Sequence, residues 1–450
     1  MIRFIYTVLL VFLSPFFLYS LYKKKEGKPT FGSRWKEHFG FTPPIKLQPD
    51  EKSIWIHAVS VGEVLGVTSL IKELKRQNPE QIIVLTTTTA TGAQQAESLR
   101  ELVEHRFMPL DFSCAVKRFI KAIQPERMII METELWPNTL ATVKGNDIPI
   151  TVINARLSKR SALRYAKVKT IFNILSSSLD QVICQHKDDA ERFIGLGLAA
   201  SKVSISGSIK FDINITPDVK IEADNLRKQL QASIIQDQDQ DQDQDQDQDQ
   251  DQDQDQKLLQ PIWIAASTHK GEDEQILNAH RKVLTLFPNA ILVLVPRHPE
   301  RFNQVAELIS NQNFKLVRRS SVKEGVNECQ VYLADSMGEM LLLLAASDVC
   351  FMGGSLIGDK VGGHNLLEPS ALGIPSITGP SYYNFKDITE QLLQAEAISI
   401  CMDSEQLADQ LIALFLDPVS SCYKGQQAMN VIKSNSGAIS RTLTLINASK

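Results

Sequence analysis

The sequence predicts an α/β protein with two domains, each built on a doubly wound parallel sheet. A chain of 450 residues is long enough for two domains of ordinary size, and 43% of its residues are hydrophobic. Along most of the chain, apolar runs of four to seven residues alternate with longer helical stretches. Such runs are typical of parallel strands that helices cover on both faces, and two separate series of them are present. We therefore expect two Rossmann-like domains, each of about six strands.

The two series of predicted strands lie on either side of a polar segment. The first comprises residues 53–59, 81–87, 127–131, 149–154, 181–184 and 203–206, and the second comprises residues 261–266, 290–295, 315–319, 330–334, 348–352 and 375–378. Between them, residues 213–260 include ten consecutive Asp-Gln pairs from Asp237 to Gln256. This segment has little to bury and a dense negative charge, so we predict a disordered linker. Binding of a metal or a partner by the acidic run is the alternative.

The charge of the chain depends strongly on this repeat. The formal net charge is −4, and the ten aspartates of the repeat contribute −10, which leaves +6 on the remaining residues. A mildly basic body suits an anionic ligand or a membrane surface, although ordinary scatter gives the same value. It is too weak to argue for nucleic acid binding. The six cysteines are at least 21 positions apart, a spacing that predicts neither a metal cage nor a disulfide framework and is typical of reduced cytosolic proteins.

Residues 4–22 form a nearly uninterrupted apolar run, which predicts a membrane anchor over residues 1–22. As a helix this run would be about 28 Å long, close to the thickness of the hydrocarbon core. Three lysines at positions 23–25 follow it, against the single Arg3 before it, which favours a cytoplasmic location for the rest of the chain. A cleavable signal peptide fits poorly, because no small-x-small site precedes the lysines. Since Pro15 would kink the helix, a half-inserted anchor is the alternative to a spanning one.

Candidate catalytic side chains of the first domain follow its predicted strands. Glu63 comes after the first strand, at the start of a helix, where it could take a proton from an attacking hydroxyl or simply interact with the helix dipole. Glu132 and Glu134 follow the third strand, and because a cap needs only one carboxylate, the pair indicates a site. Which of the two faces that site is left open. Lys210 could neutralise a phosphate or carboxylate, or form an ion pair with Asp212.

The second domain has strand ends that suit a nucleotide. Arg297 emerges at the end of a predicted strand, where its guanidinium could pair with a phosphate. His269 and His298 are interpreted as positioning or hydrogen-bonding groups. Residues 353–369 are rich in glycine, which lets the backbone approach a phosphate, and Glu368 could accept both hydroxyls of a ribose. The segment matches neither the dinucleotide fingerprint nor the P-loop, which argues against dinucleotide oxidoreduction and P-loop hydrolysis.

Taken together, these segments resemble the 3-deoxy-D-manno-octulosonic acid (Kdo) transferases of lipid A biosynthesis. The matching positions are residues 55–63, 132–138, 154–158, 207–212, 267–269, 296–299, 337–339, 362–369 and 379–380. They are many, ordered and specific to the family, and the resemblance extends from the anchor to about residue 385. The Asp-Gln repeat departs from the family's pattern, but it falls between the predicted domains.

The resemblance implies a GT-B-type glycosyltransferase, in which two Rossmann-like domains face a central cleft. Residues 1–22 would be the membrane anchor, 23–212 the acceptor-binding domain, 213–260 the linker and 261–450 the domain that binds the CMP-sugar. The implied donor is CMP-Kdo, and the implied acceptor is the phosphorylated, acylated disaccharide precursor of lipid A (lipid IVA). We expect the enzyme at the cytoplasmic face of the inner membrane, in contact with its lipids and with no nucleic acid partner.

The resemblance also implies roles for individual residues. Glu63 would be the general base on the acceptor hydroxyl, and Lys210 with Glu132 or Glu134 would stabilise the transition state. Nine residues would hold CMP: Pro296, Arg297, Met337, Gly338, Glu339, Asn365, Leu366, Leu367 and Glu368. Direct displacement with one base would invert the anomeric centre. No D-x-D metal signature is present outside the repeat, so we expect transfer without a metal ion or other cofactor.

Two other functions fit the same pattern. One is an enzyme of the same architecture that acts on a UDP-sugar, either a transferase or a nucleotide-sugar epimerase. The other is a membrane-tethered scaffold whose Rossmann-like domains bind a nucleotide without catalysing a reaction.

Overall fold

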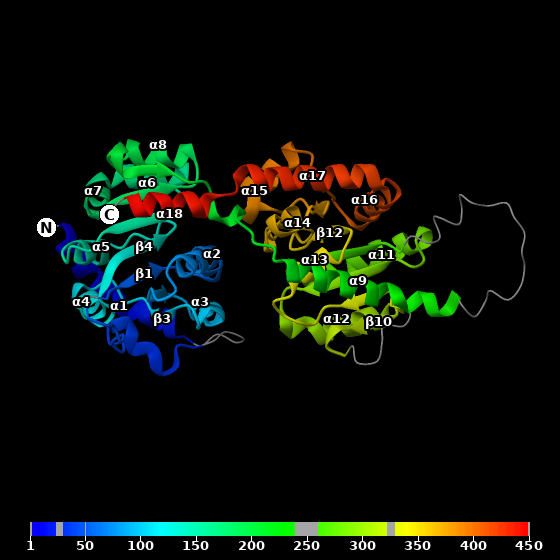
Figure 1. Cartoon of the computed structure of the whole chain (residues 1–450), viewed down its shortest axis with the longest axis horizontal. Helices are drawn as coiled ribbons and strands as arrows, with labels where there is room; N and C mark the ends of the chain where they lie inside the picture. Colours follow the sequence, from blue (N-terminus) through cyan, green and yellow to red (C-terminus); the bar gives the residue numbers. More distant parts are fainter. Residues whose placement is uncertain (1, 24–29, 50, 239–259, 322–328, 449–450) are drawn as a thin grey trace, which may run out of the picture. The chain divides into compact units, whose positions relative to one another are not determined.

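The computed structural model describes residues 2–23, 30–49, 51–238, 260–321 and 329–448 (Figure 1). The chain forms two compact units: unit 1 comprises residues 1–212 and 435–450, and unit 2 comprises residues 213–434. Each unit contains one parallel sheet covered by helices, which confirms the predicted α/β class. Most of the Asp-Gln repeat, from residue 239 onward, lies outside the described residues, so its disorder stays a prediction.

Unit 1 contains a seven-stranded sheet in the order β3-β2-β1-β4-β5-β6-β7. Because the strand order reverses between β1 and β4, their carboxyl ends flank a topological switch point, where doubly wound sheets bind ligands. The strands are β1 Ser53–His57, β2 Ile83–Thr87, β3 Glu104–Phe107, β4 Pro125–Met131, β5 Ile150–Ala155, β6 Gln181–Cys184 and β7 Val203–Ile205. The helices are α1 Ile2–Tyr22, α2 Val61–Gln77, α3 Ala90–Ala96, α4 Ser113–Ile123, α5 Pro137–Lys144, α6 Lys159–Lys167, α7 Lys169–Ser178, α8 Lys187–Gly195 and α18 Ala438–Ala448, with 3-10 turns η1 Gly32–Phe39, η2 Glu97–Leu99, η3 Ala200–Lys202 and η4 Ile209–Phe211.

Unit 2 contains a second seven-stranded sheet, in the order β10-β11-β9-β8-β12-β13-β14. Its switch point lies between β8 and β12. The strands are β8 Ile262–Thr268, β9 Ile291–Pro296, β10 Leu316–Arg318, β11 Val331–Leu333, β12 Val349–Met352, β13 Ser376–Thr378 and β14 Ile398–Ile400. The helices are α9 Pro217–Gln238, α11 Asp273–Leu286, α12 Phe302–Asn311, α13 Met340–Ala345, α14 Leu367–Leu372, α15 Lys386–Gln394, α16 Ser404–Leu416 and α17 Pro418–Asn435, with turns η5 Pro299–Arg301, η6 Arg319–Ser321, η7 Gly358–Lys360 and η8 Tyr383–Phe385.

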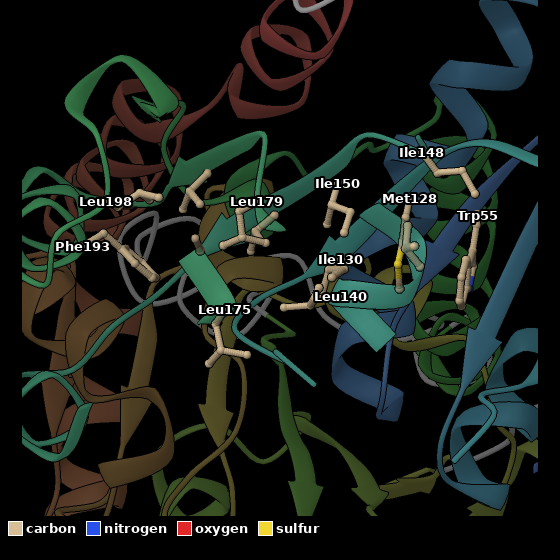
Figure 2. Close-up of a cluster of buried hydrophobic side chains, with 14 of the residues drawn as sticks. Trp55, Met128, Ile130, Leu140, Ile148, Ile150, Leu175, Leu179, Phe193 and Leu198 are labelled. Carbon is tan, nitrogen blue, oxygen red and sulfur yellow. The ribbon is translucent and has the colours of Figure 1, made fainter. Parts of the chain in front are cut away.

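Both faces of the sheet of unit 1 are buried, as its apolar strands require. Side chains alternate along β1: Trp55 packs against Phe119 in one core cluster, and Ile54 and Ile56 belong to the cluster on the other face. Figure 2 shows part of the first cluster. Trp55 is fully buried, and its indole N–H donates to Thr86 Oγ1 at 2.9 Å, so its burial leaves no donor unpaired. This packing fixes β1 and the turn that follows it.

All twelve predicted strands are present, and each end lies within two residues of its predicted position. Two strands, β3 and β14, were not predicted. Both lie at sheet edges, and β14 has only three residues. The burial of an edge strand is incomplete, so its sequence does not need the continuous apolar run that marks a central parallel strand.

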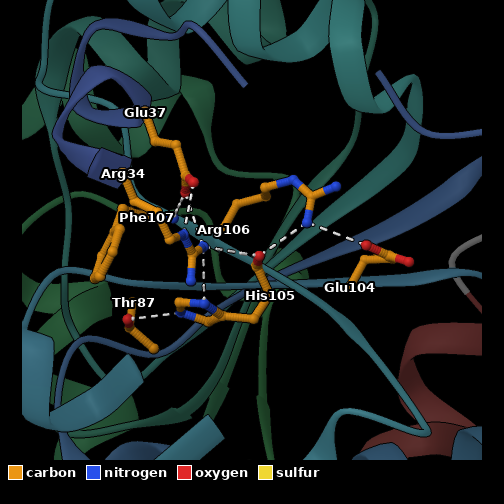
Figure 3. A network of polar contacts seen from close by, with 7 residues as sticks. All are labelled: Arg34, Glu37, Thr87, Glu104, His105, Arg106 and Phe107. Carbon is orange, nitrogen blue, oxygen red and sulfur yellow. Dashed lines mark hydrogen bonds and ion pairs between the residues drawn. The ribbon is translucent and has the colours of Figure 1, made fainter. Parts of the chain in front are cut away.

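A polar network attaches the edge strand β3 to the turn η1 (Figure 3). Glu37 is buried and accepts hydrogen bonds from Arg34 Nε and from the Phe107 backbone N–H, both at 2.7 Å. Arg34 also donates to the His105 carbonyl at 3.0 Å, and its guanidinium lies 4.7 Å from the centre of the Phe107 ring. His105 in turn lies 2.9 Å from the Thr87 hydroxyl at the end of β2. Polar contacts therefore hold this strand where apolar packing is sparse.

The predicted disordered linker over residues 213–260 is wrong for α9. This helix buries Ala223, Leu226 and Leu230 in the core of unit 2. Their spacing of three and four positions places them on one face of the helix, so a mostly polar segment can still pack. Between them, Arg227 forms an ion pair of 2.8 Å with Asp348.

The predicted second domain, residues 261–450, extends too far toward the carboxyl end. Residues 435–450 belong to unit 1, and in Figure 1 the red helix α18 lies with the blue and cyan elements of that unit. Asp212 accepts hydrogen bonds from the Gly437 and Ile439 backbone N–H groups at 2.5 and 2.6 Å. Ala438, Leu443 and Ile446 are buried in the core cluster of β1 and α2. A contact between such distant parts of the chain leaves no local signal in the sequence.

The predicted anchor is helical, but it belongs to unit 1 and packs against other elements of that unit. Thr7 Oγ1 accepts a hydrogen bond from Asn138 Nδ2 at 2.9 Å, and the Tyr22 hydroxyl lies 2.7 Å from His38 Nδ1. The helix also carries exposed aromatic side chains, namely Phe4, Phe12, Phe16 and Tyr19. Among the described residues, the structure contains no helix that is both long and apolar enough to span a bilayer, so the membrane-spanning anchor is not supported.

Candidate functional site

A cavity of about 270 Å³ lies in unit 1 at the carboxyl ends of the central strands. It is lined by Glu63, Glu132, Thr133, Glu134, Arg156, Ser158 and Ser161. Glu63 follows β1 and Glu132 follows β4, the two strands at the switch point, and Arg156 follows β5. Three of the four predicted catalytic residues therefore meet in one cavity, and the fourth, Lys210, is bonded to one of them.

Glu63 lies half-buried in the first turn of α2, with its carboxylate held from both sides. Oε2 accepts a hydrogen bond from the Val59 backbone N–H at 2.9 Å, and Oε1 accepts one from the Ser60 hydroxyl at 3.0 Å. Burial raises the pKa of Glu63, and the negative charges of Glu132 and Glu134 add to this rise, although the two hydrogen bonds oppose it. A carboxylate with a raised pKa is a stronger base, so this position suits removal of a proton from a hydroxyl.

Lys210 lies in the turn η4, and its ammonium group pairs with the Glu132 carboxylate. Nζ lies 3.0 Å from Glu132 Oε1, and the two side chains are 40% and 31% exposed. Asn154 at the end of β5 helps to fix this turn, because its Oδ1 accepts the Ile209 backbone N–H at 3.2 Å. Asp212, the alternative partner of Lys210, is instead bonded to the start of α18. The ion pair therefore joins the turn η4 to the end of β4.

The sequence leaves open which glutamate of the predicted pair faces the cavity. In the structure both Glu132 and Glu134 line it. Burial raises the pKa of Glu134, and the charge of Glu132 adds to the rise. The loop that carries both is fixed at its far end by buried Asp111, which accepts the backbone N–H groups of Asn138 and Thr139 at 3.1 and 2.6 Å. Asp111 thereby caps α5 and holds the loop in place.

Sequence reasoning assigned no role to several residues of this cavity. Arg156 contributes a cation to the lining of the cavity, and Ser158 caps α6 by accepting the Ser161 backbone N–H at 3.2 Å. Arg156 and Ser158 both lie in the stretch 154–158, one of the segments that carry the family resemblance. That stretch was the available signal, but the sequence does not say that it shares a cavity with Glu63.

In unit 2, three histidines and Arg297 gather on the loops after β8, β9 and β12. His269 Nε2 lies 2.8 Å from His364 Nε2, and the ring of His298 stands edge-on to that of His269, with centroids 5.2 Å apart. Burial lowers the pKa of His364 to about 4, and the positive charge of Arg297 contributes to this shift. Arg297 itself is exposed at the end of β9, directly after buried Pro296. The three histidines and Arg297 form a polar cluster, and the positive charge of Arg297 suits this cluster to an anion.

The four predicted CMP-binding residues around the start of α14 differ in whether their side chains are accessible to a ligand. Leu366 and Leu367 are 1% and 2% exposed, so their side chains fill the interior. Their predicted contact with CMP is left to their backbone atoms and stays a prediction. Asn365 Oδ1 accepts the Leu367 backbone N–H at 3.1 Å. Burial raises the pKa of Glu368. Asn365 and Glu368 are therefore the residues of this group whose polar side chains suit contact with a nucleotide.

The predicted segment Met337, Gly338 and Glu339 stands directly before α13. Met337 is exposed, and Gly338 has the left-handed φ of +86° that favours glycine. The Glu339 carboxylate accepts hydrogen bonds from Arg319 and Ser336, and the bond from Arg319 lowers the pKa of Glu339. Arg319, which the sequence did not single out, therefore anchors this segment.

The first glycines of residues 353–369 do not present their N–H groups to a ligand. The backbone N–H groups of Gly354, Ser355 and Leu356 all donate to the buried carboxylate of Glu272. The predicted approach of this part of the segment to a phosphate is therefore wrong, because an internal anion occupies its donors. Residues 362–368 stay the candidate for the nucleotide.

The chain is similar to known proteins both in sequence and in fold. A family model described as 3-deoxy-D-manno-octulosonic-acid transferase (kdotransferase) matches residues 33–213. Among solved structures, the chain is similar to the UDP-GlcNAc 2-epimerase of Neisseria meningitidis bound to UDP-GlcNAc, with 13% identity and a TM-score of 0.54 over 88% of this chain and 100% of that one, which shows a shared fold. It also matches the C-terminal CMP-Kdo binding domain of WaaA from Acinetobacter baumannii, with 40% identity and a TM-score of 0.37 over 38% of this chain and 89% of that one.

A curated relative covers nearly the whole chain. The 3-deoxy-D-manno-octulosonic acid transferase of Haemophilus influenzae is 37% identical over 446 residues, which are 99% of this chain and 98% of the relative. An identity of this size over nearly all of both chains goes beyond a shared fold, and the family model matches the part of unit 1 that holds the cavity. The chain therefore belongs to the Kdo transferase family of glycosyltransferases.

Proposed function

We propose that the chain transfers Kdo from CMP-Kdo to the disaccharide precursor of lipid A, lipid IVA, with inversion at the anomeric carbon and without a metal ion or other cofactor. Membership of the Kdo transferase family supports the transferred sugar. The observation that carries the residue assignment is the cavity of unit 1, where Glu63 has a raised pKa beside Glu132, Glu134 and the Lys210 ammonium bound to Glu132.

The proposed step is a single displacement. An acceptor hydroxyl oxygen bonds to the anomeric carbon of Kdo while the bond from that carbon to the phosphate oxygen of CMP breaks. The hydroxyl proton passes to Glu63, and CMP leaves with the bonding electrons. One displacement without a covalent intermediate inverts the carbon. The raised pKa of Glu63 supports the role of base, because proton affinity rises with pKa.

The surrounding charges suit the anions of this reaction. Arg156 lines the cavity of unit 1, and Lys210 forms an ion pair with Glu132, which lines it too. We assign these two cations to the acceptor phosphates or the Kdo carboxylate. Glu132 and Glu134 would stabilise positive charge that develops on the sugar ring. In unit 2, we assign Arg297 to the phosphate of CMP and Glu368 to its ribose. The remaining nucleotide contacts would come from Pro296, Met337, Gly338, Glu339 and Asn365 and from the backbone of Leu366 and Leu367.

A lipid acceptor also gives α1 a function. Phe4, Phe12, Phe16 and Tyr19 are 70–76% exposed on this helix, while Thr7 and Tyr22 bond to other elements of unit 1. We propose that α1 lies in the headgroup region of the cytoplasmic leaflet of the inner membrane and inserts these rings. Binding of the full chain to anionic vesicles tests this role, since a Phe12→Ser/Phe16→Ser variant that binds as well as the unchanged protein would exclude it.

The experiment on the reaction uses the purified full chain with labelled CMP-Kdo and lipid IVA, and mass spectrometry of the product. The Glu63→Gln variant should lose transfer by about 10²-fold or more, the range typical of a general base, and should still bind CMP in calorimetry. Glu97→Gln is the matched control, because Glu97 is an exposed carboxylate in the first turn of another helical segment of unit 1.

Two results would contradict the proposal. Transfer by Glu63→Gln at the rate of the Glu97→Gln control would remove Glu63 from the mechanism. Consumption of UDP-GlcNAc, with no turnover of CMP-Kdo in the presence of lipid IVA, would replace the donor and point to an epimerase or another transferase.

A further inference from the structure

Unit 2 contains a buried carboxylate that occupies a ring of backbone donors. Glu272 is 0% exposed, and its Oε2 accepts the N–H groups of His269 and Gly354 at 3.0 and 2.7 Å. Its Oε1 accepts the N–H groups of Ser355 and Leu356, both at 2.9 Å. We call these four backbone N–H groups the amide nest. Convergent N–H groups of this kind are the usual means by which a loop binds an anion.

The amide nest joins the two strands at the switch point of unit 2. His269 stands in the loop after β8, and Gly354 to Leu356 form the loop after β12. The loop after β12 also lies close against the end of β8, because a Cβ added to Gly353 would lie 2.9 Å from the Ser267 carbonyl oxygen. Because Glu272 bonds to both loops at once, it fixes the carboxyl end of β8 against that of β12.

The same contacts reach the predicted nucleotide segment. The Gly354 carbonyl accepts the Gly363 backbone N–H at 2.8 Å, and a Cβ added to Gly354 would lie 2.8 Å from Cδ2 of the His364 ring. His364 Nε2 lies 2.8 Å from His269 Nε2, and the His269 backbone N–H is itself part of the amide nest. Thus Glu272 holds both histidines of the pair, one through its backbone and the other through Gly354.

We propose that Glu272 is a positioning residue for the donor nucleotide: it takes the place of an anion in the amide nest and thereby orients His269, His364 and the segment 362–368 toward CMP. The proposal rests on the proposed function for the identity of the nucleotide, but the filled amide nest does not depend on it. It also implies where the donor phosphate does not bind. Since Glu272 occupies the N–H groups of Gly354, Ser355 and Leu356, the phosphate must be bound outside residues 353–356.

Replacement of Glu272 by alanine tests this arrangement in the full chain. Four charge-assisted hydrogen bonds disappear, so we expect CMP affinity and KM for CMP-Kdo to worsen by about tenfold or more, with a smaller change in kcat. Formate is a carboxylate small enough to enter the emptied amide nest, and it should restore both thermal stability and CMP affinity to Glu272→Ala in a saturable way. Glu274→Ala is the matched control, since Glu274 is exposed in the same first turn of α11.

The outcomes separate positioning from general stabilisation. CMP binding by Glu272→Ala equal to that of Glu274→Ala would overturn the proposal, as would rescue of stability by formate without rescue of CMP affinity. If Glu272→Ala does not fold, Glu272→Gln provides the same test, because its amide nitrogen would face backbone donors and weaken CMP binding while the side-chain volume is kept. If the unchanged protein fails to turn over CMP-Kdo, the proposed function fails, whereas formate-dependent stabilisation of Glu272→Ala still reports on the amide nest.

Discussion

Replacement of Lys210 by methionine should remove most of the transfer activity while it leaves unit 1 folded. The ammonium lies 3.0 Å from Glu132, but the two side chains are 40% and 31% exposed. An ion pair this accessible to solvent contributes about 0–1 kcal/mol to stability. Loss of one preorganised charge from a catalytic site typically lowers kcat by about 10²–10³-fold, which is about 3–4 kcal/mol in the transition state. The free energy of unfolding and the rate should therefore respond very differently.

Unit 1 contains a matched control for this change. Lys144 at the end of α5 lies 2.6 Å from Asp180, and these side chains are 45% and 32% exposed. Lys144→Met should therefore cost about as little stability as Lys210→Met, about 0–1 kcal/mol, with no effect on transfer. Combining Lys210→Met with Glu132→Gln should cost less in rate than the sum of the two single changes, because the residues act as a pair.

The assay is single-turnover transfer with saturating CMP-Kdo and lipid IVA, accompanied by urea unfolding of each variant. Lys210→Met that transfers Kdo as fast as Lys144→Met would refute the assignment of Lys210 to the transition state. A large loss of stability in Lys210→Met alone would instead show that the ion pair is structural, and the rate could then not be interpreted as catalysis.

Two further predictions concern stability. Glu37→Ala should destabilise the chain by about 1–3 kcal/mol in urea unfolding, because it leaves the buried Phe107 backbone N–H without its acceptor. An unchanged unfolding midpoint would disprove this role of the network in Figure 3. Burial lowers the pKa of His57 to about 4 and that of His280 to about 3, from 6.5, so the folded state keeps both neutral while the unfolded state takes up protons first. The stability from these histidines is complete above about pH 6.5 and is lost as the pH falls through about 4 for His57 and about 3 for His280. A His57→Gln variant whose free energy of unfolding depends on pH as strongly as that of the unchanged protein would contradict this.

The sequence predicts the central parts of both sheets well, because a strand that is covered on both faces must be apolar throughout. Its failures are elements held by contacts that have no local pattern. The edge strand β3 relies on Arg34 and Glu37, seventy residues before it, and α18 returns to unit 1 through Asp212. α9 needs only Ala223, Leu226 and Leu230 on one face, and a composition dominated by polar residues conceals so narrow a stripe.

Some residues of the candidate site can likewise be predicted from the sequence, and others cannot. Glu63, Glu132 and Glu134 can be predicted, because residues that follow parallel strands gather at one edge of the sheet. The direction of a side chain cannot be predicted from that rule, and so Leu366 and Leu367 were assigned to CMP although they point into the core. Glu272 was missed for the same reason. In the sequence it is one acidic residue near the start of a helix, and only the packing of two loops turns it into the anion of the amide nest.

Backbone strain gives an independent view of where function lies. Among the described residues, seven that are not glycine have a left-handed φ, namely Gln124, Glu132, Asp147, Asn154, Ser267, Asn313 and Glu396. Four of them stand between a helix and the next strand, where a left-handed residue commonly ends a helix. The other three, Glu132, Asn154 and Ser267, stand at the carboxyl ends of β4, β5 and β8.

These three positions do not end helices, and the pairing of β5 with β6 and of β8 with β9 is irregular at Asn154 and Ser267. A left-handed residue other than glycine costs about 1–3 kcal/mol, so it persists only where its surroundings enforce it. Lys210 binds the side chain of Glu132, and Asn154 bonds to the turn that carries Lys210. Strain of this kind redirects side chains at the end of a strand. The strained residues lie beside the cavity of unit 1 and at the carboxyl end of β8 in unit 2. Backbone strain therefore points to the same two sites as the chemistry of the side chains.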